Sequence, residues 1–322
     1  SHFRRIDFDF GNFVMIMTKS AAKSLMLPAA MAAGALFYRW MGYLTFLSPY
    51  LIFIMLTITY CRVKPSEFRP KRFQWHLLSV QMALAAVAYF ALVTWDRTLA
   101  EGVFICVFIP TATAAPVITG MLGGSISALA TYSLLCNVFV AVAGPVVLAA
   151  VGEHPEMSFL QSFLIICRNV FPLLILPIIA ALGMERFVPK AHAWLVRRQE
   201  LSFYIWAVSL FIVVGSSVSF AINRFTPGSA MTMVLLALGA LVVCILQFAA
   251  GRRVGHHFGD TVSGGQGLGQ KNTLLAIWIA LTYLNPIASI APAAYVAWQN
   301  IINSWQLILH ERHKHQVLGI RH

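Results

Sequence analysis

The sequence predicts an all-α polytopic membrane protein, and three observations carry this prediction. The 322 residues are 59% hydrophobic and only 11% charged, and the mean hydropathy is +0.76, whereas soluble domains carry about 25% charged residues. Apolar runs long enough to cross a bilayer as helices follow one another along the chain. Two of these runs are interrupted near their middle by proline or glycine. We therefore expect one membrane domain.

We expect ten transmembrane helices in this domain. Five in each half place the second half in the opposite orientation from the first, which makes two inverted repeats, residues 25–151 and 158–309. The membrane domain spans 25–310, between a cytoplasmic or interfacial segment (1–24) and a cytoplasmic tail (311–322). The expected helices, in chain order, are 25–42, 43–61, 74–95, 102–122, 126–151, 158–184, 201–223, 229–251, 262–284 and 287–309.

The charge distribution orients the chain and excludes a nucleic-acid partner. The net charge is +12, but the basic residues lie in short loops between apolar runs rather than on one face. With the N-terminus in the cytoplasm, eighteen of the 23 lysines and arginines fall inside, and Arg39, Arg97 and Arg224 fall outside. Cytoplasmic loops of membrane proteins carry such an excess. We therefore expect an integral protein of the inner or plasma membrane with both termini cytoplasmic.

The two interrupted runs predict broken helices, at residues 110–116 and 264–272. A broken helix leaves unpaired carbonyls at the end of its first half and unpaired N–H groups at the start of its second. N-termini near Pro116 and Asn272 would favour an anionic group, and the carbonyl ends would suit a cation. The alternative is that proline and glycine merely kink ordinary helices, which membrane helices tolerate.

Two cations, Lys271 and Arg168, fall at bilayer depth, whereas all eleven carboxylates fall in loops, tails or helix ends. A polar cavity with excess positive charge suits an anionic substrate. The alternative for Arg168 is that it snorkels to an interface or bonds backbone carbonyls. The candidate substrate-binding residues are Thr111, Thr113, Ala115, Pro116, Arg168, Asn169, Gln266, Lys271 and Asn272.

The interrupted runs resemble those of the bile acid:sodium symporter family. This family belongs to a wider group of ten-helix carriers, which also includes auxin-efflux-type proteins. The family's motif of Pro, two Gly, Thr, Ala, Ser and Asn is similar to residues 110–116, and its Glu followed four residues later by Gln-Asn is similar to Gln266 with Gln270-Lys271. The resemblance extends from the third to the tenth expected helix. It implies a panel and a core domain, in which the fourth and ninth helices cross beside sodium and organic-anion sites.

Departures from the family pattern fall on the sodium ligands. The family's Ser and Asn ligands fall on Ala115 and Pro116, and its glutamate falls on Gln266. Sodium prefers oxygen ligands, usually with a carboxylate. We expect Lys271 to take the place of a bound cation, and because a desolvated lysine can release its proton, proton coupling or uniport becomes an alternative to sodium. The candidate ion-coupling residues are Gln81, Thr131, Ser133, Gln266, Gln270 and Lys271.

The function that these observations favour is secondary transport of an organic anion by alternating access. The substrate is either an amphipathic anion such as a bile acid or a smaller carboxylate. Beyond Na+ or H+ as coupling ion, we expect no cofactor and no metal, and a monomer is the simplest assembly. An enzyme would need His, Asp, Glu or Cys clustered at one depth, and the sequence shows no such cluster. A substrate sensor built on a carrier fold is the remaining alternative.

Overall fold

The structure is a computed structural model that describes residues 26, 28–62, 66, 68–112, 115–152, 158–198, 200–223 and 227–317. Within these ranges the chain is almost wholly helical, and six helices are long and apolar enough to cross a membrane. Large apolar side chains are exposed on their outer faces, among them Val87 (65%), Phe90 (71%) and Leu160 (62%). Lipid is the medium that covers such a surface at no cost, which supports an integral membrane protein.

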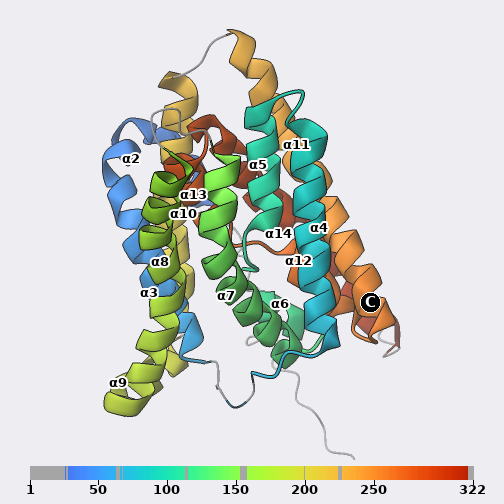
Figure 1. Cartoon of the computed structure of the whole chain (residues 1–322). Helices are drawn as coiled ribbons and strands as arrows, with labels where there is room; N and C mark the ends of the chain where they lie inside the picture. Colours follow the sequence, from blue (N-terminus) through green and yellow to red (C-terminus); the bar gives the residue numbers. More distant parts are fainter. Residues whose placement is uncertain are drawn as a thin grey trace, which may run out of the picture.

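The helices gather into two groups that lie side by side in Figure 1. In one group α10 packs against α2 and α3, and α3 packs against α8; in the other α11 packs against α12, α14, α5 and α4. The helix α7 contacts α8 on one side and α12 on the other, and so joins the groups. The elements are α2 (Tyr38–Leu44), η1 (Thr45–Leu47), α3 (Ser48–Tyr60), α4 (Arg72–Leu92), α5 (Arg97–Phe108), α6 (Ala115–Met121), α7 (Ile126–Val151), α8 (Phe159–Phe187), α9 (Pro189–Arg197), α10 (Glu200–Asn223), α11 (Pro227–His257), α12 (Thr261–Gly269), α13 (Thr273–Tyr283), η3 (Pro286–Ser289) and α14 (Ile290–Val317).

The expected helix boundaries agree with the structure for α7, whereas α5 begins at Arg97 and not at residue 102. The helix α7 coincides with the expected 126–151, because Ser125 caps it by accepting a hydrogen bond from the Ala128 N–H. The expected boundary between residues 42 and 43 is wrong, because Tyr38–Tyr60 forms one nearly continuous span with Gly42 inside α2. Over these residues the structure therefore has one long span where the ten-helix expectation has two. The expected 1–24 segment lies outside the described residues, and α14 continues to Val317 in the expected tail.

Both interrupted runs are broken helices, and an aspartate starts each of them. The Asp96 carboxylate accepts from the Leu99 N–H at the start of α5, and the Asp260 carboxylate accepts from the Ser263 N–H at the start of α12, both at 2.9 Å. These caps satisfy N–H groups that a helix start otherwise leaves unpaired. In Figure 1, α5 and α13 lie in the upper half of the molecule, and α12 and α6 in the lower half. The broken helices therefore enter from opposite ends.

The glycine-rich stretch is helical, which corrects the expectation that it is unwound from Gly264 onward. The helix α12 continues to Gly269, so only Gln270–Asn272 separates it from α13. The glycines serve packing instead, because a Cβ on Gly264 would lie 2.1 Å from the carbonyl oxygen of Gly251 on α11. Small residues let membrane helices approach backbone to backbone in this way.

Glu101 corrects the expectation that no carboxylate is buried. It lies inside α5 and is only 1% exposed. One of its oxygens pairs with the Arg97 guanidinium at 3.4 Å, and the other accepts from the Asn285 N–H at 2.7 Å. The guanidinium also donates to the Val151 carbonyl at 2.8 Å. Glu101 therefore ties α5 to the turn before η3, and its charge is matched by Arg97.

Replacing Glu101 by alanine should destabilise the protein by ~2–4 kcal/mol, because the Asn285 N–H and the partly buried Arg97 guanidinium lose a buried acceptor. Denaturation by SDS, followed by circular dichroism, measures this loss. Glu200→Ala is the matched control, since the Arg198–Glu200 pair is about half exposed on both sides (57% and 51%) and 3.7 Å long. The control should cost less than ~1 kcal/mol. Equal losses in the two variants would contradict the structural role assigned to Glu101.

Candidate functional site

The two broken helices meet at their interruptions and cross in antiparallel directions. Thr111 and Lys271 form an isolated antiparallel bridge. The Ala112 N–H donates to the Gln270 carbonyl at 3.0 Å, and the Asn272 N–H donates to the Pro110 carbonyl at 2.9 Å. The two breaks therefore satisfy each other's backbone groups, as a chain at bilayer depth requires. The expectation that the interruptions lie together is confirmed.

A glutamine and a tyrosine close the carbonyl end of α5. The Gln81 side chain on α4 donates to the carbonyls of Phe108 and Ile109, at 3.0 Å each. Its amide oxygen accepts from the Tyr132 hydroxyl on α7. All of these groups are buried. The last carbonyls of α5 thus receive a neutral donor from α4, and Tyr132 on α7 holds that donor in place.

The carbonyl end of α12 has a similar arrangement. The Tyr295 hydroxyl on α14 donates to the Gly269 carbonyl at 2.8 Å. The Gln247 amide on α11 donates to the Tyr295 hydroxyl at 2.9 Å and to the Cys106 carbonyl on α5 at 3.3 Å. One glutamine and one tyrosine therefore hold each broken helix against its neighbours.

Lys271 places a cation inside the crossing. Its side chain is 1% exposed, and its ammonium donates to the Ile109 carbonyl at 3.3 Å. The Lys271 backbone N–H donates to the Gln299 side chain on α14 at 2.9 Å. Among the described residues no carboxylate pairs with the Lys271 ammonium. A buried ammonium in contact with one carbonyl has capacity for two further hydrogen bonds.

The start of α13 adds polar groups next to Lys271. The Asn272 side chain caps α13 by accepting from the Leu275 N–H at 3.3 Å. The Asn272 amide nitrogen and the Thr273 hydroxyl are both buried and have no hydrogen-bond partner. A helix N-terminus with unpaired donors is a favourable place for an anion. This end of α13 therefore carries hydrogen-bond donors that no other group of the described residues accepts from.

A row of glutamines leads from the crossing toward α14. The Gln270 amide donates to the Gln266 side-chain oxygen. The Gln266 amide in turn donates to the Gln306 side chain on α14 at 2.7 Å. Thr111 bonds the same helix, because its hydroxyl donates to the Gly267 carbonyl at 2.8 Å. Gln266 and Gln270, which the sequence predicts as site residues, are therefore hydrogen-bonded to each other.

Six of the residues that the sequence predicts as site residues lie together at the crossing. Ala115 is buried at the start of α6 and Pro116 follows it, but Thr113 lies outside the described residues. Arg168 and Asn169 are exposed on α8 and make no hydrogen bond to the residues of the crossing, so the expected pairing of Arg168 with a central site is not seen. The residues at the crossing are Gln81, Thr111, Gln266, Gln270, Lys271 and Asn272.

Thr131 and Ser133 are buried on α7, but Tyr132, which lies between them, is the residue of these three that bonds Gln81. Sequence reasoning missed Tyr132, Tyr295 and Gln299, although each is a polar side chain within an apolar run. Each of them lies in the long helix that follows a broken helix in the sequence, and this shared position could have identified them.

The crossing is closed in this conformation, which corrects the expectation of a cavity there. Its side chains are buried, and Thr111 and Lys271 line neither the cavity of about 590 Å³ between α4 and α11 nor the one of about 410 Å³ beside it. A buried site of this kind needs movement of the surrounding helices before a ligand can enter.

A scan of the chain against models of known protein families finds no match, and neither does a comparison with curated proteins. The resemblance to bile acid:sodium symporters therefore stays a prediction that rests on the motifs at residues 110–116 and 266–271.

Proposed function

We propose that this chain is a secondary carrier of organic anions whose substrate site is the crossing of the two broken helices. The observation that carries the proposal is the buried Lys271 ammonium without a carboxylate, next to the unpartnered Asn272 amide and Thr273 hydroxyl. Charged groups inside a membrane are costly and mark substrate or ion pathways. An anion bound at the crossing would supply the acceptors that these donors lack.

The same three elements recur around each break, which supports the proposed inverted repeats (25–151 and 158–309). A glutamine on the preceding helix, an aspartate cap and a tyrosine on a following helix appear in the same order. They are Gln81, Asp96 and Tyr132 in the first half and Gln247, Asp260 and Tyr295 in the second. In this scheme the two helix groups act as panel and core domains, and movement of one against the other gives alternating access.

Sodium-independent transport is the coupling scheme that the crossing favours. The Lys271 ammonium lies against the Ile109 carbonyl, at the helix end where a bound cation would be expected. Gln81 already donates to the same carbonyl and to that of Phe108. These oxygens therefore face donors rather than an open sodium site. We propose that Lys271 serves as a fixed cation, with proton coupling or uniport in place of sodium.

The proposed orientation places the lower end of the molecule in Figure 1 in the cytoplasm. The start of α4, the end of α11 and the basic helix α9 all lie at the lower end of the molecule in Figure 1. These segments carry Arg72, Arg253 and Arg197. A common basic end agrees with the expected cytoplasmic side.

Uptake into proteoliposomes tests the proposed function. We expect saturable uptake of radiolabelled taurocholate or of a smaller carboxylate such as acetate, at equal rates in sodium and in choline buffers. Strictly sodium-dependent uptake that Lys271→Ala leaves intact would overturn the coupling scheme. Anion binding by thermal shift without any uptake would identify a sensor instead. Absence of both binding and uptake would overturn the anion site itself.

A further inference from the structure

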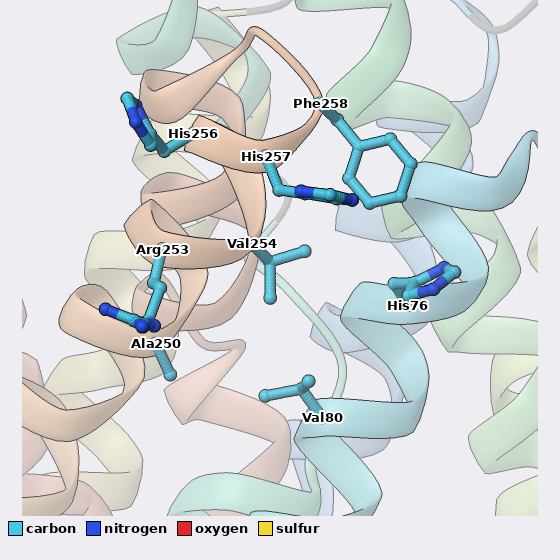
Figure 2. Close-up of a pocket in the computed structure, with 8 residues that line it drawn as sticks. All are labelled: His76, Val80, Ala250, Arg253, Val254, His256, His257 and Phe258. Atoms are coloured by element: carbon cyan, nitrogen blue, oxygen red, sulfur yellow. The ribbon is translucent and has the colours of Figure 1, made fainter.

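A groove runs between α4 and α11, on the side of α11 that does not pack against α12. Its first part is the cavity of about 590 Å³ shown in Figure 2, where Val80 on α4 and Val254 on α11 point toward each other. Its second part, about 410 Å³, continues along the same two helices past Leu84 and Leu246. The two cavities thus follow one another along a single groove.

One end of this groove is cationic and aromatic. Arg253, His256 and His257 line it from α11, and His76 lines it from α4. The Phe258 ring lies 5.1 Å from the rings of both His76 and His257 and 5.6 Å from that of Phe73. No carboxylate is among the eight residues that line this cavity. The nearby Asp260 carboxylate accepts from the N–H groups of Ser263 and Ser125.

The rest of the groove is apolar. On α4 it follows Ala88 and Leu92, and on α11 it follows Val242 and Leu238, with the α5 residue Val103 also contributing. The stretch of α4 from His76 to Leu92 is about 24 Å long at ~1.5 Å per residue. One leaflet of a bilayer has a hydrocarbon half-thickness of roughly 15 Å. The groove is therefore long enough for an acyl chain that starts at the cationic end.

We propose that this groove is a binding site for an anionic phospholipid. The headgroup phosphate would lie near Arg253 and the histidines, and one acyl chain would lie between α4 and α11. A basic pocket at the interface attracts anionic headgroups, and the apolar groove adds contacts that a free phosphate could not make. The α4 N-terminus lies at the same end, where its N–H groups favour negative charge. This inference is independent of the proposed transport function.

Lipid titration followed by native mass spectrometry tests the site. The purified chain is titrated with palmitoyl-oleoyl phosphatidylglycerol or with phosphatidylcholine of the same chains, and inorganic phosphate serves as a headgroup without chains. We expect tighter binding of the glycerol lipid than of the choline lipid. Arg253→Gln should weaken binding of the glycerol lipid by about fivefold, the effect of one basic residue near an anionic surface. Binding of the choline lipid should not change.

Two further variants separate this site from general attraction to lipid. Val242→Trp should weaken binding of both lipids by filling the groove, and Val242 is 55% exposed, so the fold tolerates the larger ring. Arg197→Gln, the same charge change on the exposed face of α9, should alter neither lipid. Equal binding of the two lipids, equal weakening by Arg197→Gln and Arg253→Gln, no effect of Val242→Trp, or displacement of the lipid by inorganic phosphate would each overturn the proposal.

Discussion

Replacing Lys271 by methionine should reduce anion uptake by at least ~30-fold. The Lys271 ammonium is the one charge at the crossing among the described residues. Removal of one partner from a buried charge pair costs ~2–5 kcal/mol of binding free energy. Methionine keeps the length and apolar stem of the side chain while removing the charge. Initial rates of uptake into proteoliposomes, over a range of substrate concentrations, measure the effect. We expect the loss mainly in substrate affinity.

The same substitution should make the substrate-free protein more stable. The Lys271 ammonium is buried and donates to the Ile109 carbonyl, and no carboxylate among the described residues pairs with it. An apolar side chain of similar volume removes the desolvation cost of that charge. The melting temperature of the detergent-purified variant should therefore rise while uptake falls. If Lys271 only stabilised the fold, its replacement would lower both the melting temperature and the uptake.

Lys190→Met is the matched control, because Lys190 is an exposed lysine on α9 far along the chain from the crossing. It should change neither uptake nor melting temperature. Uptake by Lys271→Met at the wild-type rate would contradict the role of Lys271 in substrate binding. An equal loss in both variants would show that the effect is not specific to the crossing.

The positions of the breaks could be predicted from the sequence because the signal is local. Proline, glycine and consecutive small or polar residues are poorly suited to a continuous membrane helix, so residues 110–116 and 264–272 stand out, although only 270–272 is non-helical in the second run. The contact between Thr111 and Lys271 followed from the expected placement of the two breaks in equivalent helices. This contact was predicted from the expected topology of the whole chain, since the sequence of neither segment indicates its partner.

What the sequence could not predict depends on tertiary packing. Glycine both breaks helices and lets them approach closely, so the sequence does not distinguish these roles in Gly264–Gly269; the neighbouring α11 decides in favour of packing. Arg168 lies in an apolar run, but the side of α8 on which it projects depends on the helices around it. Glu101 was misplaced because the true start of α5 is set by the Asp96 cap.

Replacing Gly264 by alanine should destabilise the protein by at least ~3 kcal/mol. A Cβ at this position would lie 2.1 Å from the Gly251 carbonyl oxygen and 2.7 Å from the Gly255 Cα. Both are backbone atoms of α11, so no side-chain rotation can relieve the clash, and the helices must move apart. Because α12 leads directly into the crossing, this movement should also lower anion uptake. SDS denaturation and proteoliposome uptake measure the two effects.

Gly183→Ala on α8 isolates the clash from the general effect of adding a methyl group to a helix. No atom lies within 4 Å of a Cβ built at Gly183. This variant should be neutral or more stable by up to ~1 kcal/mol, because alanine favours helix over glycine. If Gly264→Ala were as stable as Gly183→Ala, backbone contact would not limit the distance between α11 and α12. The glycines of α12 would then need another explanation, such as the helix ending that the sequence alone indicated.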